Sequence, residues 1–569
     1  MFPDSVFTNV RRWSGWAVLF FATSALVFAQ APALRGAVRN AHHKPMEGVV
    51  VTASRPDSNI AVSVDSRADG SYRFPAGTLA RASYQLTIRA EGFDLVQARP
   101  AAVAAGKTAH VDLELVPARD EAGQLTGSEW LQSVPGTPAQ KQALYHCVAC
   151  HSITPIVESS YSAQSWMAVL IRMRNWGGES VRSSPVKLPF SEAIKPDPVL
   201  AAYLASINRG PDAKWDYQTA KLTTNPRPAG AATDVLITEY TLDPGALPHD
   251  AIVDYRPGPY RGDIWYNDFQ RDLVGRLDPR TGQYKEWKLP ALKPGWPEGL
   301  LSLKFGPEGD LWIPRFRKAG MTRFDPRTKK FTTWPVPADY NNARSDTSHV
   351  SPCGPNGVVW FPDTENRVMY QLNPATGKID VFPLFPSYHP AHTVDVYGHS
   401  TKPTGHRSYG TACDAAGNVY FADIAGGNIG EINAVTGKAT LYKTPTLESG
   451  PRRMSMDATG KLWFGENYSS KLGMFDTRTH QFREWTPPIP WSGPYPAMRN
   501  RLGDVWTGGM STDFVYRLNP KTGQWTSYLL PTRNAEIRWI TVDSSTTPPT
   551  IWIPEVHRGK IARLQILPN

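Results

Sequence analysis

Two cysteines and a histidine stand together in the segment Cys147-Val148-Ala149-Cys150-His151. Cys-x-x-Cys-His is the attachment sequence of c-type haem. Two thiols at this spacing form thioether bonds to the two vinyl groups of one porphyrin, and the adjoining His151 places an imidazole on the iron. A disulfide or half a zinc site uses the same residue types, but zinc requires a second pair of ligands downstream, and none follows closely. The motif therefore predicts covalently attached haem c.

The residues around this motif have the signals of three helices. Thr137-Pro138 and Asp197-Pro198 each place an N-cap residue before a proline at the first helical position. A third helix is expected from residue 163 to residue 176, ending before a pair of glycines. Residues 128–210 are therefore predicted to form a small α-helical cytochrome c domain.

The middle helix offers a sulfur ligand for the iron. Trp166, Val169, Leu170 and Met173 follow the i, i+3, i+4, i+7 spacing of one helical face. Met173 is the predicted second axial ligand because it lies on this apolar stripe, whereas Met167 falls at its edge. A methionine that simply fills the core is the alternative interpretation.

This segment resembles two groups of haem proteins. The run from residue 199 to residue 204 is similar to the closing helix of class I cytochromes c, which packs against the first helix, although the usual methionine before it is missing. The run Trp166 to Gly177 resembles the Trp-to-Met pattern of the quinohaemoprotein amine dehydrogenase α-subunit haem domain. That domain carries two haem motifs and this chain carries one.

The beginning of the chain has the pattern of an export signal. Arg11 and Arg12 precede an apolar run from Trp16 to Phe28, which is followed by small residues suited to signal peptidase. Residues 1–29 are therefore predicted to be a signal peptide, and the protein to be periplasmic or secreted. A retained N-terminal anchor is the alternative. No later run approaches the roughly 18 apolar residues of a membrane span, so none is expected after cleavage.

Length and composition indicate several mainly β domains. The 569 residues exceed the roughly 250 to 300 at which one core stops growing. The 51 prolines, 45 glycines and 19 tryptophans favour many short strands and turns. The net charge of +10 is modest for this length and forms no basic cluster, so no nucleic-acid partner is expected. A mildly basic surface does suit an acidic redox partner.

Residues 34–117 alternate apolar and polar positions between turn signals such as Asp69-Gly70. The order of glycines and aromatic residues, including Asp69 to Phe74 and Glu91-Gly92-Phe93, resembles the carboxypeptidase regulatory-like domain. The resemblance implies an immunoglobulin-like β-sandwich. No carboxylate pair or nucleophile stands out, so a spacer or docking role is expected.

After a predicted linker at residues 211–232, the chain repeats. Aromatic residues within short strands recur at intervals of about 45 residues, the period of propeller blades. They are Trp265, Trp312, Trp360, Tyr420, Trp463, Trp506 and Trp552. Most are followed by a turn of the type Asp/Asn-Pro-x-Thr-Gly, expected to join the outer two strands of a blade. Residues 233–569 are therefore predicted to form a seven-bladed β-propeller, whose incomplete last blade is closed by the early strand Val235 to Leu242.

These repeats resemble streptogramin (virginiamycin B) lyase, in which two histidines open the innermost strands of neighbouring blades and a glutamate follows the Trp-bearing strand of one. Pro248-His249 is the single pair of that kind here, and His349 lies two blades further on. His249, His349 and Glu555 are the candidate catalytic residues that the resemblance implies. The corresponding positions of other blades are Tyr409, Arg452, Tyr495 and Arg538, with Glu298 less securely aligned.

A polar rim is also expected at one end of the propeller channel. It comprises Asp268, Arg315, Asp363, Asp423, Glu466 and Glu555, each three residues after an aromatic strand position. Such a rim suits a small-molecule ligand or a divalent cation, and solvated polar residues are the alternative.

Two further features concern cysteine and histidine. Cys353 and Cys413 occupy equivalent positions in adjacent blades, so their side chains are expected to point the same way and remain buried thiols. A histidine-containing insertion follows the third blade and is expected to be an exposed loop. Its histidines are His389, His392, His399 and His406.

The leading interpretation is an exported monohaem c-type cytochrome with electron-transfer activity, whose propeller is a platform for a substrate or redox partner. The alternatives are a lyase or hydrolase of the streptogramin lyase type and a non-catalytic ligand-binding protein. The loss of the neighbouring histidine pair disfavours the lyase.

Overall fold

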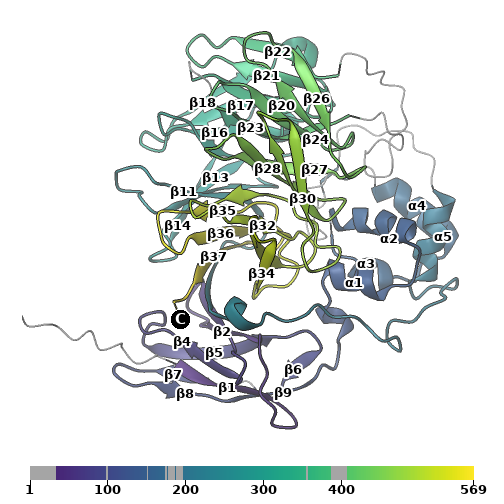
Figure 1. Ribbon diagram of the computed structural model, residues 1–569, viewed down its shortest axis with the longest axis vertical. Helices are drawn as coiled ribbons and strands as arrows, with labels where there is room; N and C mark the ends of the chain where they lie inside the picture. Colours follow the sequence, from purple (N-terminus) through teal and green to yellow (C-terminus); the bar gives the residue numbers. More distant parts are fainter. Residues whose placement is uncertain are drawn as a thin grey trace, which may run out of the picture.

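A computed structural model describes most of the chain (Figure 1). The described residues are 34–97, 100–149, 151–173, 176, 186–187, 197–353, 357–385 and 406–568. The predicted signal peptide, Cys150 and three of the four insertion histidines (His389, His392 and His399) lie outside them. Within them, no helix is long and apolar enough to cross a membrane.

The first part is a two-layer β-structure, drawn in purple in Figure 1. Its strands are β1 (Leu34–Asn40), β2 (Val50–Ser54), β3 (Ile60–Asp65), β4 (Ser71–Phe74), β5 (Ala82–Arg89), β6 (Phe93–Leu95), β7 (Ala101–Val103), β8 (Ala109–His110) and β9 (Leu113–Pro117). One sheet has the order β4-β1-β9-β6 with β8 beside β1, and the strands β3-β2-β5-β7 form the other layer. Alternate side chains of these strands, such as Leu34, Val38 and Leu86, are buried between the layers.

A group of short helices follows. They are α1 (Gly127–Ser133), α2 (Pro138–Tyr145), α3 (Thr154–Val157), α4 (Ala163–Met173) and α5 (Pro198–Ser206), with a 3-10 turn η2 (His146–Ala149) after α2. The predicted caps are confirmed: Thr137 caps α2 together with Gln140, and Asp197 accepts hydrogen bonds from the first amides of α5. Helices α1 and α3 were not predicted. Trp130 of α1 and Leu204 of α5 lie in one apolar core.

The largest part consists of sheets arranged as propeller blades. The first three are β11 (Pro248–Val253), β12 (Ile264–Asp268), β13 (Leu273–Leu277) and β14 (Tyr284–Lys288); β15 (Lys304–Phe305), β16 (Leu311–Pro314), β17 (Gly320–Phe324) and β18 (Phe331–Pro335); and β19 (Ser351–Pro352), β20 (Val359–Asp363), β21 (Val368–Leu372) and β22 (Ile379–Pro383). The next three are β23 (Ser408–Cys413), β24 (Val419–Asp423), β25 (Asn428–Ile432) and β26 (Ala439–Lys443); β27 (Pro451–Met456), β28 (Lys461–Glu466), β29 (Lys471–Asp476) and β30 (Gln481–Trp485); and β31 (Met498–Arg499), β32 (Val505–Gly508), β33 (Phe514–Asn519) and β34 (Gln524–Leu529). The last contains β35 (Thr541–Asp543), β36 (Thr550–Glu555), β37 (Lys560–Ile566) and the early strand β10 (Val235–Thr241).

Seven such four-stranded units are therefore present within the described residues, as the repeat predicted. The innermost strand β11 of the first blade contacts β35 of the last, so the ring is closed. The closing strand is confirmed as well, because β10 pairs with β37 along its whole length. The repeated turns join the outer two strands of a blade, and Gly282 there has a φ of 75°, which glycine adopts without strain.

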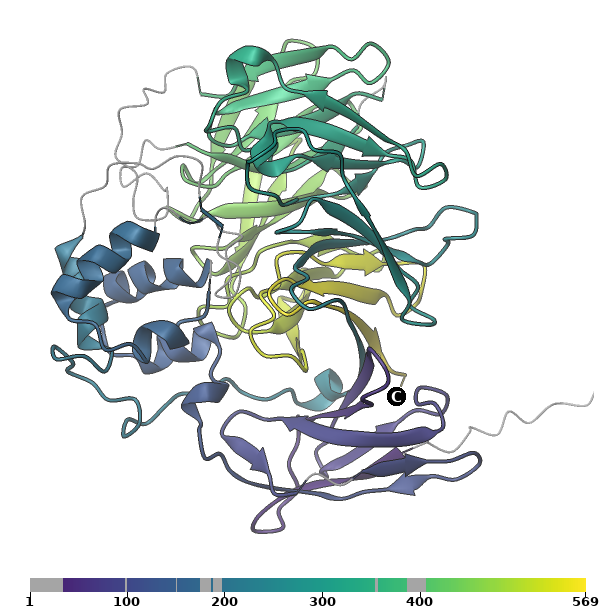
Figure 2. The same cartoon turned by 180° about the vertical axis from the view of Figure 1, so that it is seen from behind.

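The seventh blade does not end at β10. The outer edge of β10 pairs antiparallel with β3 of the sandwich, from Leu236 opposite Val64 to Tyr240 opposite Ile60. One eight-stranded sheet, β35-β36-β37-β10-β3-β2-β5-β7, therefore runs from the propeller axis into the sandwich. Figures 1 and 2 show the two parts stacked end to end with the helices alongside. The predicted linker is fastened to the sandwich, since Arg227 and the amide of Gly230 both donate to Glu47.

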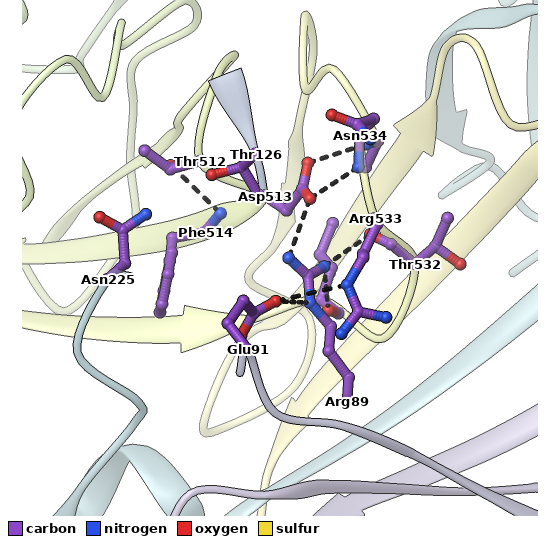
Figure 3. Close-up of polar contacts among 12 residues, drawn as sticks. Arg89, Glu91, Thr126, Asn225, Thr512, Asp513, Phe514, Thr532, Arg533 and Asn534 are labelled. Carbon is purple, nitrogen blue, oxygen red and sulfur yellow. Dashed lines mark hydrogen bonds and ion pairs between the residues drawn. The ribbon is translucent and has the colours of Figure 1, made fainter. Parts of the chain in front are cut away.

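A buried ion-pair network joins sandwich and propeller (Figure 3). The guanidinium of Arg89 donates to Glu91 at 2.8 Å, to Asp513 at 3.0 Å, and to the backbone carbonyls of Leu530 and Thr532. Both carboxylates are almost fully buried. Because every charged group has a partner across the boundary, the network fixes the relative position of the two parts.

The helices join the same junction through Glu129, which is 1 % exposed. Its carboxylate accepts hydrogen bonds from Thr126 and from the amide of Asn225 in the linker. Burial, together with the charge of Glu91, raises the pKa of Glu129 to about 6. The three parts thus meet in one charged core.

The prediction for two cysteines is wrong. Cys353 and Cys413 form a disulfide, with their Cα atoms 6.3 Å apart. Both lie at the outer ends of innermost strands of adjacent blades, and Ser351 and Thr411 of these strands share a hydrogen bond at 2.8 Å. The strand registers explain the bridge: Pro352 lies opposite Val359 and Cys413 lies opposite Val419, so the two cysteines are offset by one residue rather than equivalent. Side chains one residue apart along a strand point to opposite sides, so those of Cys353 and Cys413 can face each other between the two blades.

Candidate functional site

The predicted haem segment lies at the end of α2, where the helix tightens into η2. Cys147 is 9 % exposed and belongs to the apolar core of the helices. Tyr203 of α5 lies in the same apolar core. Burial, and the charge of Cys147 when it is ionised, raise the pKa of Tyr203 to about 12. The closing helix therefore packs beside the motif, as expected.

The ring of His151 is oriented by its own backbone. Its Nδ1–H donates to the carbonyl of Ser152 at 2.7 Å. This bond fixes the tautomer and leaves the lone pair on Nε2, the arrangement that metal-bound histidines have. A buried thiol, an oriented imidazole and an apolar wrapping fit haem c, with Cys147 and His151 as two of its four predicted attachment points.

Helix α4 has the predicted apolar stripe in part. Trp166, Val169 and Leu170 are buried in α4, but Met173 at its end is 40 % exposed. Met167 is partly buried and packs against the core. The thioether of Met173 thus lies at the surface of the helical core.

A ring of side chains surrounds the propeller axis at the first positions of the innermost strands. The ring contains His249, His349, Tyr409, Arg452, Tyr495 and Arg538, all buried. Several members are in contact: His349 packs on Tyr409 at 4.2 Å between ring centroids, and the hydroxyls of Tyr409 and Tyr495 lie 2.5 Å apart. The strand registers confirm the predicted alignment for four positions, because each lies three residues before the residue opposite the aromatic strand position, as His249 does; they are Tyr409, Arg452, Tyr495 and Arg538. The alignment of His349 is wrong by one residue, since Ser351 lies opposite Trp360 and Ser348 holds the equivalent position. Glu298 is a second exception, since it pairs with Lys288 and is substantially exposed.

Sequence reasoning missed two members of this ring, Asp250 and Arg453. Successive residues of a strand face opposite sides, so regular strands would turn the neighbours of His249 and Arg452 away from the axis. The ladders of blades one and five shift register at Pro248/Ala251 and at Pro451/Met454. A bulge of this kind turns a second residue inward, and no sequence signal for it was available.

His249 has the geometry of a base held by a carboxylate. Its Nδ1 donates to Asp250 at 2.9 Å, and Asp250 is bound by both terminal nitrogens of Arg453. Burial lowers the pKa of His249 to about 4, outweighing the effect of Asp250. The imidazole is therefore neutral at pH 7, and its buried Nε2 has no hydrogen-bond partner among the described residues.

The opposite part of the ring carries positive charge. Arg452 is enclosed by the rings of Tyr409, Tyr468 and Tyr495 at 5.0–5.5 Å, and it has no carboxylate partner among the residues described. Both ring nitrogens of the neighbouring His349 lack a partner in the same part of the chain. Burial and nearby Arg453 lower the pKa of Lys304 to about 8. A buried guanidinium without a counter-ion is costly, so this region suits an anionic group.

The expected rim carboxylates do not converge. They are buried at the ends of separate strands and bind residues that follow them closely: Asp268 binds Arg271, Asp363 binds Asn366, and Asp423 binds Asn428. Arg315 of the second blade pairs with Asp272 of the first. Within the described chain, no group of three or more His, Cys, Asp or Glu side chains is placed to hold a metal ion.

Glu555 lies in β36 with Glu239 and Lys560 as its charged neighbours. Burial and the charge of Glu239 raise its pKa well above the usual range. A protonated Glu555 could donate a proton. The strands that carry Glu555 and His249, β36 and β11, are in contact across the ring closure, and no hydrogen bond joins the two side chains among the described residues.

The helices dock on the same end of the propeller as the ring. Tyr145, the last residue of α2, donates to the carbonyl of Asn467 at 3.0 Å, and His146 packs on Tyr468 at 4.7 Å between centroids. Tyr468 in turn binds Arg452 through its hydroxyl at 3.1 Å. A continuous series of contacts thus connects the residue before Cys147 with the axial ring.

Comparison with known proteins supports two of the three parts. Residues 393–567 match the virginiamycin B lyase family, and residues 33–116 match the carboxypeptidase regulatory-like domain. These matches cover the later part of the propeller and the sandwich. No curated protein matches the chain.

Solved structures with similar folds include virginiamycin B lyase from Staphylococcus aureus, which is 20 % identical over 58 % of this chain and 100 % of its own, with a TM-score of 0.49. A streptogramin B lyase is 21 % identical over 59 % and 100 %, also at 0.49. The extracellular domain of a putative one-component system from B. thetaiotaomicron is 13 % identical over 56 % of this chain and 40 % of its own, at 0.41.

Proposed function

We propose that the protein is an exported, periplasmic or secreted monohaem c-type cytochrome with electron-transfer activity, and that its propeller is the platform for a substrate or redox partner. Residues 128–210 form the cytochrome domain in this proposal. Cys147 and Cys150 attach the haem, and His151 and Met173 are its axial ligands. The bound haem would supply a one-electron redox couple.

The observation that carries the proposal is the position of the attachment motif against the axial ring. His146, directly before Cys147, contacts Tyr468, and Tyr468 binds Arg452. The polypeptide itself therefore keeps the motif and the ring in proximity. A cytochrome domain that served only as a soluble carrier would gain nothing from docking its haem motif on a second buried polar site.

The ring suggests the chemical class of the molecule. The unpaired guanidinium of Arg452 and the neutral imidazole of His349 favour an anionic group, and the rings of Tyr409 and Tyr495 favour an apolar body attached to it. A small organic anion is therefore the expected ligand, and the cationic surroundings disfavour a divalent cation there.

The first test is covalent attachment. The exported protein should keep its colour through denaturation and acid-acetone extraction, and the double variant Cys147→Ser, Cys150→Ser should lose it. The matched control is Cys353→Ser with Cys413→Ser, which also removes two cysteines and should retain the haem. Extraction of the colour from the unaltered protein would refute the proposal.

A second function is favoured by one observation, the oriented base His249 with an unpartnered Nε2. A lyase or hydrolase needs such a base together with an acid or metal at the leaving group. Incubation with a type B streptogramin and a divalent cation tests it. Ring opening that is abolished by His249→Ala would make this function primary. Saturable binding without product would instead identify a non-catalytic ligand-binding protein.

A further inference from the structure

A cleft of about 640 Å³ lies at the seam between the sandwich and the end of the propeller chain. Its walls come from β1, β3 and β4 on one side and from the start of β10 and Leu567 on the other. The volume is within the range of small-molecule sites, roughly 300–1,000 Å³. In Figure 1 the C-terminal end of the chain lies beside β4.

Three basic side chains form a row across one wall of this cleft. Arg35 of β1 is directly opposite Arg73 of β4 in the antiparallel ladder and directly opposite His110 of β8 in the parallel one. All three line the cleft, and both arginines are exposed. Neither arginine forms an ion pair within the described ranges. Like charges directly opposite each other destabilise a sheet, so an anion between them would remove a standing repulsion.

The remaining charges of the cleft leave an excess of positive charge. Asp112 is occupied by His110 at 3.2 Å and by the amide of Ala37. Asp234 is bound by Arg67 at 2.5 Å. These two carboxylates are thus already bound, and within the described structure neither forms an ion pair with Arg35 or Arg73.

The inner wall contains a buried acceptor. Asp65 is 4 % exposed, lines the cleft, and neither of its carboxylate oxygens has a hydrogen-bond partner among the described residues. Burial raises its pKa well above the ordinary value. An unsatisfied polar group at the wall of a cavity is the position at which a ligand donor would be bound.

We propose that this cleft binds a small organic anion that also carries a hydrogen-bond donor. The anionic group lies between Arg35 and Arg73, and the donor reaches Asp65. Carboxylate and phosphate satisfy the arginines equally, because guanidinium binds both in a bidentate manner. The site is separate from the axial ring and does not depend on haem.

The test is titration calorimetry of the full-length protein with three probes. Glycolate carries a carboxylate and a hydroxyl, acetate carries the carboxylate alone, and inorganic phosphate represents the other anion class. Saturable binding of glycolate or phosphate is expected, and whichever binds more tightly identifies the class. Acetate should bind about tenfold more weakly than glycolate, the loss expected for one hydrogen bond to a buried group.

Variants assign the binding to the cleft. Arg35→Gln with Arg73→Gln should weaken glycolate and phosphate binding by about 100-fold, because two charge-assisted contacts are removed. Asp65→Leu should abolish the preference for glycolate over acetate. Arg81→Gln is the control, since it removes the same charge from an exposed sandwich position outside the cleft.

Both arginines are exposed and carry like charges opposite each other, so the double variant should unfold at the same or a slightly higher urea concentration than the unaltered protein, which checks its integrity. Absence of saturable binding by all three probes would overturn the proposal. So would binding that survives the double arginine substitution, or an equal loss in the Arg81 variant.

Discussion

Arg89 is the side chain whose removal should have the largest effect on how the parts are held together. The substitution Arg89→Met keeps the aliphatic length but removes donors to Glu91, Asp513 and two carbonyls. Breaking a buried ion pair by removing one partner costs about 3–5 kcal/mol.

The lower end of this range applies here. Asp513 keeps two backbone donors, from Asn534 at 2.7 Å and Ala535 at 2.8 Å, and Glu91 keeps Arg533 at 3.6 Å. The expected loss is therefore about 3 kcal/mol, which is roughly a 100-fold change in the equilibrium that holds the sandwich on the propeller.

Urea unfolding followed by tryptophan fluorescence and by far-ultraviolet circular dichroism measures the loss. The sandwich residues 34–117 contain no tryptophan, so fluorescence reports on the propeller and helices, while circular dichroism reports on all parts. In Arg89→Met the two transitions should separate and the earlier one should occur at lower urea. Arg81→Gln is the control. A change below about 1 kcal/mol, the value of an exposed pair, would refute the reasoning.

Three further predictions concern the junction, the disulfide and the iron ligand. Burial raises the pKa of Glu129 to about 6, so its protonation stabilises the folded protein, and this stabilisation is lost as pH rises from about 4.5 through 6. In Glu129→Gln the urea midpoint of unfolding should lose that part of its pH dependence. An unchanged pH profile would contradict the assignment. Reduction of the Cys353–Cys413 disulfide, which closes a loop with a sequence separation of 60, should destabilise the propeller by about 4 kcal/mol. The urea midpoint of unfolding should therefore be lower in the presence of a reductant, and the Cys353→Ser variant should show the same lower midpoint in its absence. Met173→Ala should abolish the weak long-wavelength sulfur-to-iron absorption band and lower the haem potential with little change in stability, because this side chain is exposed; if Met167→Ala does so instead, the ligand assignment is wrong.

Much of the fold could be predicted because its signals are local or periodic. The Trp/Tyr repeat gave the number of blades, and the residues left over after Trp552 indicated that Val235 onward must close the ring. Thr137 and Asp197 marked helix starts because capping depends only on neighbouring residues.

The site was predictable only as far as strand alternation holds. His249 and Arg452 were found from the repeat, whereas Asp250 and Arg453 face the axis because of bulges that depend on packing between blades. The pairing of Cys353 with Cys413 was missed because the two residues were taken as equivalent, whereas the strand registers offset them by one residue. The contact of His146 with Tyr468 joins residues more than 300 positions apart, and no local pattern indicates it.

The pairing of β10 with β3 has a consequence for the order in which the chain can fold. Because synthesis proceeds from the N-terminus, the sandwich is complete long before the propeller, and β10 can pair with strand β3 of the sandwich as soon as residue 241 has been synthesised. β10 is then already paired with β3 while the six following blades are synthesised. The last strand, β37, finds a prepared edge at which to end the ring. The sandwich would in this way act as an internal template, and the slowest contacts of a propeller, those between its two ends, would form on a surface that is already in place.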